Sequence, residues 1–117
     1  MPFKFENLRV FHYALEINDQ VCKLVKGFPK DELFILTSQI KRAADSVVLN
    51  ITEGSTMLSP TEFRRFLVIA NRSALEVVGC LYLSRNRKYI NEQEFKDFYD
   101  KVEKLVAMIQ ALINSIK

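Results

Sequence analysis

The chain has 117 residues, which is the size of one domain and too short for two ordinary ones. Hydrophobic residues make up 49% of it and charged residues 26%, a mix that is typical of a soluble globular protein and excludes a disordered or fibrous one. Three Gly and three Pro are too few for a fold of short strands and tight turns, and a net charge of +3 is too small for a protein that packages DNA.

Helical periodicity predicts two helices in the first half of the chain, over about residues 6–26 and 30–53. The apolar positions of the first are Val10, Phe11, Ala14, Leu15, Ile17, Val21, Cys22, Leu24 and Val25. Those of the second are Leu33, Leu36, Ile40, Ala43, Ala44, Val47 and Ile51. Gly27 is expected to cap the first helix in the left-handed conformation, before Pro29, and Gly54 is expected to end the second.

Capping signals predict two further helices, over about residues 60–87 and 92–116. Ser59, Pro60 and Glu62 form a start signal, and Asn91 with Glu94 forms another. The third helix has its apolar stripe at Phe63, Phe66, Leu67, Ala70, Ala74, Val77, Val78 and Leu81. The stripe of the fourth comprises Phe95, Phe98, Tyr99, Val102, Leu105, Val106, Ile109, Leu112, Ile113 and Ile116.

Short connections between long amphipathic helices favour antiparallel neighbours. The sequence therefore predicts an all-α fold, a single antiparallel up-down-up-down four-helix bundle over residues 1–117.

A second apolar stripe lies outside these core positions. On the third helix Val68, Leu75 and Tyr82 recur every seven residues, and Gly79 between them would allow close backbone approach. The second helix adds three more apolar residues that face away from its core stripe, namely Phe34, Ile35 and Leu49. The two stripes indicate a contact between subunits of a homo-oligomer, with an irregularly widened core as the alternative.

Positive charge is concentrated on the third helix and its exit. Residues 60–90 carry six basic and two acidic side chains, whereas residues 1–59 are neutral and residues 91–117 have a net charge of −1. With a basic pair on the second helix, the candidate nucleic-acid-binding residues are Lys41, Arg42, Arg64, Arg65, Arg72, Arg85, Arg87 and Lys88. Guanidinium groups suit phosphate contacts. The alternative is a solvated face with salt bridges between subunits.

A polar row lies beside the apolar stripe of the second helix and comprises Gln39, Ser46, Asn50 and Glu53. Its expected role is structural, in hydrogen bonds to the facing helix or to the loop after Gly54, because buried amides need partners. Contact with a ligand is the alternative.

Catalytic and metal-binding patterns are missing from the sequence. His12 is the only histidine, and no phosphate loop, HExxH, CxxC or nucleophile elbow occurs. Cys22 and Cys80 are expected to be buried reduced thiols, with a disulfide or a reactive thiol as the alternatives. No signal-peptide-like run follows Met1, and the longest uncharged C-terminal run is shorter than the roughly 20 residues of a membrane span. We expect a cytoplasmic protein without enzyme activity, cofactor, metal or membrane contact.

The stretch QIKRAADSVVLNITEG, residues 39–54, resembles the hallmark of the 23S rRNA-intervening sequence proteins, a bacterial family of four-helix bundles. Further matching positions are Phe5, Leu8, Phe28, Pro29, Glu32, Phe63, Phe66, Leu67, Ile69, Ala70, Ser73, Leu75, Glu76, Tyr89 and Ile90. The chain departs from the family pattern at Phe11, where Trp is usual, at Thr52, where Ala is usual, and at Asn71, where Gly is usual.

The resemblance implies a small bacterial cytoplasmic bundle that often assembles as a ring-like homopentamer. A related branch serves as an accessory to retroelement reverse transcriptases and binds nucleic acid through basic surfaces. Two functions therefore stand side by side. One is an oligomer that binds RNA through its basic surface, and the other is a scaffold or accessory subunit, for a reverse transcriptase or another protein, without direct nucleic-acid contact.

Overall fold

Four long helices build the chain, and the computed structural model describes them within residues 3–117. They are α1 (Arg9–Leu24), α2 (Leu36–Ser55), α3 (Pro60–Asn86) and α4 (Glu92–Ser115). Three short 3-10 helices accompany them: η1 (Lys4–Asn7) precedes α1, and η2 (Val25–Gly27) and η3 (Lys30–Glu32) connect α1 to α2. The predicted domain start at residue 1 lies outside the described residues.

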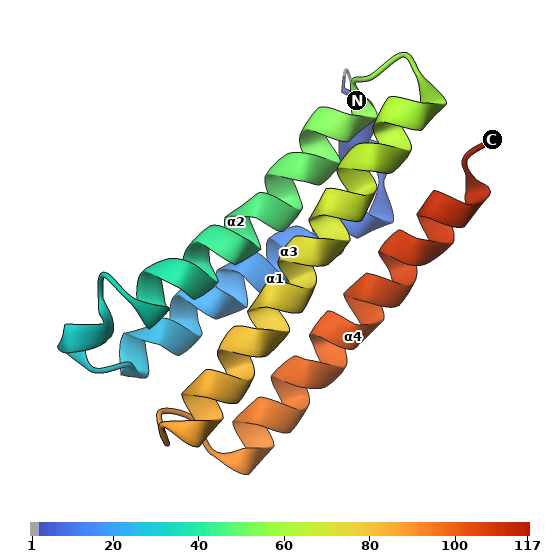
Figure 1. The fold of residues 1–117 in the computed structure, drawn as a ribbon. Coiled ribbons are helices and arrows are strands. Elements are labelled where there is room, and N and C mark those ends of the chain that lie inside the picture. Colours follow the sequence, from blue (N-terminus) through green and yellow to red (C-terminus); the bar gives the residue numbers. More distant parts are fainter. Residues whose placement is uncertain (1–2) are drawn as a thin grey trace.

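Consecutive helices run in opposite directions along an elongated bundle (Figure 1). Each helix packs on the next in the chain, and α4 closes the bundle against α1. The principal-axis extents are 44 × 23 × 22 Å. Among residues 3–117 all regular structure is helical, so the predicted all-α four-helix fold is confirmed.

The starts of α3 and α4 follow the predicted capping signals. Ser59 Oγ accepts a hydrogen bond from the Glu62 backbone N–H, and Pro60 is the first residue of α3. At α4, Asn91 Oδ1 accepts from the Glu94 N–H at 2.8 Å, while Glu94 Oε1 accepts from the Asn91 N–H at 2.9 Å. This reciprocal pair is the predicted capping box.

The α1–α2 connection differs from the prediction. The second helix begins at Leu36 and not at residue 30, because residues 30–32 form a 3-10 turn and Glu32 places a side-chain oxygen 3.4 Å from the Leu36 N–H. Leu33, predicted in the core, is therefore exposed. No described glycine has a positive φ, so Gly27 is not the predicted left-handed cap. The chain after α1 instead tightens into η2, which satisfies part of the carbonyls at the helix end.

Two glycines have different surroundings. Gly54 is buried and is the last residue but one of α2, which ends at Ser55, one residue after the predicted end at Gly54. A Cβ on Gly54 would lie 2.7 Å from Phe66 Cβ, so this glycine permits the close approach of α2 and α3. Gly79, predicted to allow close backbone approach at the second apolar stripe, is exposed and has open space around it in the single chain, so its role between subunits stays a prediction.

The core lies along the bundle axis and contains most of the predicted apolar positions. Its largest fully buried side chains are Leu36, Ile40, Ile51, Leu67, Leu81, Leu105 and Ile109. Two predicted core positions of α1 are wrong: Leu15 and Cys22 are exposed. Cys80 is buried, and burial raises the pKa of its thiol to about 11. Both cysteines are free.

Helix α3 is long and apolar enough to cross a membrane, by length and composition alone. In the bundle its buried stripe packs on α2 and α4. The core helix of a soluble bundle has the same composition, so this finding assigns no membrane contact.

Candidate functional site

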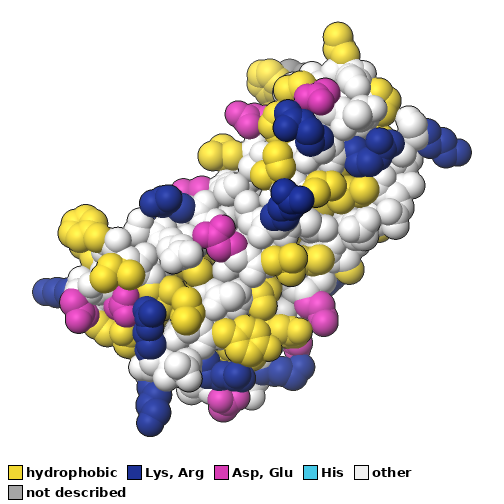
Figure 2. All heavy atoms as spheres, viewed as in Figure 1, with side chains coloured by type: hydrophobic (Ala, Val, Ile, Leu, Met, Phe, Trp, Pro, Cys, Tyr) yellow, Lys and Arg dark blue, Asp and Glu magenta, His cyan; other side chains and the backbone are white. Residues whose placement is uncertain are grey.

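An exposed apolar ridge runs along the outer side of α3. Val68, Leu75 and Tyr82, which are 38%, 59% and 47% exposed, form this α3 ridge. Their spacing of seven residues places them one above another on the helix. Hydrophobic side chains interspersed with basic ones are visible on the face of the bundle drawn in Figure 2.

The ridge continues onto α4 at its Tyr82 end. The Tyr82 ring lies 4.9 Å from that of Phe95 and 6.5 Å from that of Tyr99, centroid to centroid. The Arg85 guanidinium carbon lies 4.1 Å from the Phe95 centroid, and Arg85 also pairs with Glu92 at 3.5 Å. These contacts hold Tyr82 toward α4 and occupy Arg85, a predicted nucleic-acid contact.

A second apolar patch lies between α1 and α2. A groove of about 330 Å³ is lined by Leu15, Asn18, Asp45, Val48 and Leu49, and we call it the α1–α2 groove. Leu49, predicted as an interface residue, is 57% exposed, and Leu15, predicted in the core, is 47% exposed. Asn18 donates a hydrogen bond to Asp45 Oδ1 at 2.8 Å. Helical periodicity does not indicate this groove, because it predicts Leu15 in the core.

The remaining predicted interface residues lie at the end of the bundle. Phe34 is 88% exposed, and Leu33 and Ile35 beside it are also exposed. These three residues precede α2, and we call them the 33–35 tip. The six predicted interface positions thus fall on three separate surfaces.

Half of the predicted basic residues are engaged within the chain. Arg64 is partly buried and donates a hydrogen bond to the Ile116 carbonyl at 3.0 Å. Arg65 pairs with Glu62 at 3.3 Å on the surface. Arg87 pairs with Glu32 at 3.0 Å, and Arg85 is held by the aromatic cluster. Four of the eight predicted basic residues thus have partners within the chain, and their role in nucleic-acid binding stays a prediction.

The other half make no ion pair among the residues that the structure describes. Lys41 and Arg42 are exposed on α2, Arg72 is exposed on α3, and Lys88 is exposed in the turn after α3. Lys88 adopts a φ of 64°, and its N–H donates to the Arg85 carbonyl at 2.9 Å.

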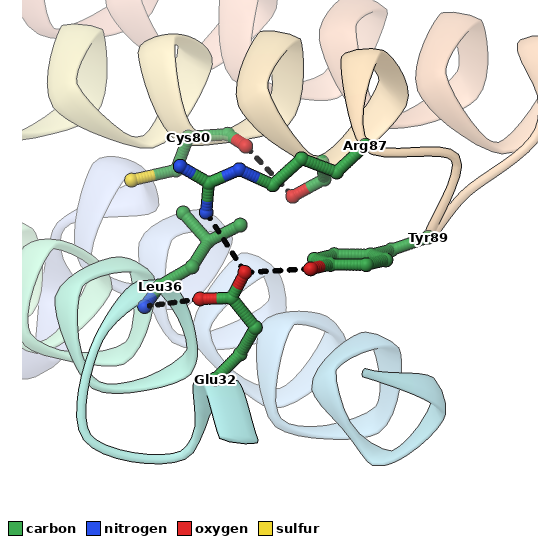
Figure 3. A network of polar contacts seen from close by, with 6 residues as sticks. Glu32, Leu36, Cys80, Arg87 and Tyr89 are labelled. Carbon is green, nitrogen blue, oxygen red and sulfur yellow. Dashed lines mark hydrogen bonds and ion pairs between the residues drawn. The ribbon is translucent and has the colours of Figure 1, made fainter. Parts of the chain in front are cut away.

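A polar network that the sequence analysis did not identify joins the two turns at one end of the bundle (Figure 3). Glu32 Oε2 accepts hydrogen bonds from the Tyr89 hydroxyl at 2.6 Å and from Arg87 at 3.0 Å, while Oε1 lies 3.4 Å from the Leu36 N–H. The hydrogen bond from Tyr89, followed by the backbone bond and the Arg87 charge, lowers the pKa of Glu32 despite its burial. The same contact raises the pKa of Tyr89.

The predicted polar row divides into an inner and an outer pair. The Ser46 and Ser73 hydroxyl oxygens lie 2.8 Å apart across α2 and α3, and Asn50 donates to the Ser46 carbonyl at 2.8 Å. Gln39 and Glu53 are exposed, and their side chains make no hydrogen bond among residues 3–117.

The remaining candidates for catalysis or metal binding are isolated side chains. His12 Nε2 lies 2.7 Å from the Glu6 carbonyl, in contact with the first turn of the chain. Within the described part of the chain, no three His, Cys, Asp or Glu side chains gather as a metal site.

A comparison with models of protein families shows to which family the chain belongs. Residues 6–111 match the family model of the 23S rRNA-intervening sequence protein. The chain belongs to this family. The predicted resemblance is thus confirmed; the further relation to retroelement accessory proteins stays a prediction.

A solved structure resembles the chain over almost its whole length. It is a protein of unknown function from the S23 ribosomal protein family of Bacteroides thetaiotaomicron, with a TM-score of 0.84 and 23% sequence identity. The match covers 91% of this chain and 96% of the other, and it shows a shared fold. A comparison with curated proteins found no match.

The stretch that carries the family resemblance, residues 39–54, lies wholly within α2. It ends at Gly54, where the structure explains the residue by contact with α3. Asn71, which replaces the usual Gly, lies between α3 and α4: its Nδ2 is 3.5 Å from the Val106 carbonyl, and its buried Oδ1 has no partner among the described residues. The family member thus carries an amide that is only half satisfied.

Proposed function

We propose that this family member functions as a homo-oligomer, with five copies as the resemblance implies, and that the copies contact each other through the α3 ridge. The observation that carries the proposal is the exposure of Val68, Leu75 and Tyr82 at a spacing of seven residues. Removing apolar surface from water stabilises an association by about 25 cal/mol per Å². Apolar residues aligned along one side of a helix can all be buried in the same contact, so their contributions to the free energy of association add up.

Light scattering coupled to size-exclusion chromatography tests the assembly. We expect a mass of five times 13.6 kDa for the wild type. Leu75→Glu should lower the mass to that of one chain without loss of far-UV helicity, because Leu75 points away from the core. The matched control is Leu58→Glu, since Leu58 is fully exposed outside the ridge and its replacement should leave the mass unchanged. A wild-type monomer at micromolar concentration would contradict the proposal.

As a second function we propose that the assembly, in the bacterial cytoplasm, binds RNA through basic side chains of α2 and α3. The supporting observation is that Lys41 and Arg42 are exposed and make no ion pair with any residue from 3 to 117, and that the Arg65 pair with Glu62 is solvent-exposed and therefore weak. Repetition of these charges in every copy would strengthen the field that attracts a polyanion. No base-reading module occurs in the sequence, so binding should be largely sequence-independent.

A paired charge reversal tests RNA binding. Arg42→Glu with Arg65→Glu should strongly weaken the binding of a single-stranded RNA, and the wild-type log affinity should fall with log salt by about 0.7 per phosphate neutralised. The control is Lys26→Glu with Lys117→Glu, an equal change of charge at exposed residues that make no ion pair within the described part of the chain. Equal weakening by both pairs would mean that only net charge matters.

Absence of RNA binding by the wild type at low salt would favour the scaffold function. The 33–35 tip supports that alternative, because Phe34 is the sort of exposed aromatic side chain that anchors a protein partner such as a reverse transcriptase.

A further inference from the structure

A pocket beside the 33–35 tip combines an exposed aromatic ring with two basic side chains. It has a volume of about 350 Å³ and lies along the first turns of α2. We call it the tip pocket, and its lining includes Leu33, Phe34, Ser38, Lys41, Arg42 and Asp45. Its aromatic, basic and hydroxyl groups distinguish it from the apolar α3 ridge.

The Phe34 side chain leaves most of its surface open to water. It is 88% exposed, and among residues 3–117 no other aromatic ring lies against it. A planar ring at the surface offers a face on which another flat group can stack, and that contact removes apolar surface of both groups from water. Phe34 therefore suits a flat ligand.

Two positive charges and one negative charge line the tip pocket. Lys41 and Arg42 are exposed, and neither makes an ion pair within residues 3–117. Asp45 carries the opposing charge, lies one helical turn after both cations, and accepts a hydrogen bond from Asn18 of α1 at 2.8 Å. Along the helix the two cations thus lie between Phe34 and the carboxylate. An anion bound beside Phe34 meets the cations first, and Asp45 weakens the attraction without cancelling it.

Two further features of the tip pocket favour an anion. The pocket lies at the N-terminal end of α2, a helix of 20 residues, where the helix dipole is positive. The half-buried Ser38 side chain makes no hydrogen bond among residues 3–117, so its hydroxyl can donate to an anionic oxygen. A ligand that joins a flat ring to an anion matches this pocket, and a nucleotide is such a ligand.

We propose that the tip pocket binds single-stranded RNA, with an unpaired base stacked on Phe34 and the adjoining phosphates on Lys41 and Arg42. The inference rests on the proposed RNA binding and adds the form of RNA and the side chain that holds its base. Aromatic rings beside basic groups hold single strands without regard to sequence, because every base has a face that can stack. Bases inside a duplex are already stacked on their neighbours, so the pocket should favour single strands.

A protein segment fits the tip pocket less well than a nucleotide. An apolar partner surface would cover Phe34 but would also take water from Lys41 and Arg42 without pairing their charges. Phosphates pair with both cations and leave the pocket open to solvent. The observations therefore favour the nucleic acid.

Fluorescence anisotropy with two labelled probes tests the stacking. One probe is an oligouridylate of about ten nucleotides, a length within the range bound by single-strand proteins. The other has the same number of phosphates but abasic sites in place of the bases. Phe34→Ala should weaken binding of the oligouridylate about tenfold and leave binding of the abasic probe unchanged, because the ring acts only on a base. Phe34→Tyr should keep the wild-type affinity for both probes.

Ile35→Ala is the matched control. Ile35 is the exposed neighbour of Phe34 and does not belong to the pocket lining, so its replacement should leave both affinities unchanged. Lys41→Gln with Arg42→Gln should weaken both probes alike, because these side chains contact phosphates. All variants should keep the helicity and the light-scattering mass of the wild type.

The outcomes separate this inference from the proposed RNA binding. Wild-type affinity of Phe34→Ala for the oligouridylate, or an equal loss for both probes, would overturn the stacking and leave RNA binding through the basic residues standing. Phe34 would then be available to a protein partner. A lower mass of Phe34→Ala would place the ring in a contact between copies and would also overturn it. A wild type that binds neither probe at low salt would overturn both proposals.

Competition with a duplex provides a second test. Unlabelled duplex RNA should displace the labelled oligouridylate less well than unlabelled single-stranded RNA at the same concentration of phosphate. Equal competition by the two forms would contradict the preference for single strands.

Discussion

The backbone of Gly54 packs directly on the side chain of Phe66, since a Cβ built on Gly54 lies 2.7 Å from Phe66 Cβ. Both atoms belong to rigid helices, so neither can yield without moving α2 against α3. The contact explains why a residue that weakens helices by about 1 kcal/mol relative to Ala stands inside α2.

Gly54→Ala should therefore destabilise the protein. Overpacking costs about 1–3 kcal/mol and exceeds the gain in helix propensity of about 1 kcal/mol. Urea denaturation followed by circular dichroism measures the change. Gly79→Ala is the matched control, because it has open space around it and should stabilise the chain in the dissociated Leu75→Glu background. Equal stabilisation by both substitutions would contradict the close approach at Gly54.

Glu32 should make stability depend on acidic pH. Its folded-state pKa is lowered, so its contribution is complete above the unfolded glutamate pKa of about 4.3 and is lost as the pH falls through the lower folded value. Glu32→Gln should reduce stability at pH 7 and flatten the loss of stability between neutral pH and about pH 3. Urea midpoints measured over this range test the effect. Parallel curves for wild type and variant would show that other carboxylates dominate.

Ser46 and Ser73 should act as one unit. Removal of either hydroxyl leaves the other without its cross-helix partner and should cost about 1 kcal/mol. The double replacement by alanine should cost clearly less than the two single losses together. A double-mutant cycle of unfolding free energies measures the coupling; strict additivity would exclude an interaction.

Arg64 and Arg65 should differ in their effect on stability although they are neighbours. Arg64→Gln removes the hydrogen bond to the Ile116 carbonyl and should destabilise the protein by roughly 1 kcal/mol or more, since the donor is charged. Arg65→Gln removes an exposed i,i+3 pair and a guanidinium contact 5.3 Å from the Phe66 ring centroid, and it should change stability by less than about 1 kcal/mol. Thermal unfolding of the two variants provides the comparison, and equal shifts would contradict an anchoring role for Arg64.

The fold was predictable because helix periodicity and capping are local signals. The start signals at Ser59 and Asn91 placed α3 and α4 to within a residue, since their hydrogen bonds form between residues three apart. The start of α2 was wrong by six residues, because it depends on Glu32, whose partners Arg87 and Tyr89 lie more than fifty residues away. No local pattern contains that information.

The candidate site was predictable only in part, for the same reason. Leu75 faces outward by helical periodicity alone, and the structure places it so. A broad apolar arc does not show where the core ends, so periodicity predicts Leu15 in the core although the side chain is exposed. The clustering of arginines in sequence did not reveal that Arg64, Arg85 and Arg87 turn toward three different partners.

The contacts of Glu32 also determine how the bundle can open. This carboxylate belongs to the connection of the first helical hairpin, whereas Arg87 and Tyr89 belong to the turn of the second. Separation of the hairpins at this end would strip a charged oxygen of its partners, so neither turn can fray without loss at the other. The two hairpins are thereby joined into one cooperative unit, and backbone amides on both turns should exchange with solvent in the same opening event.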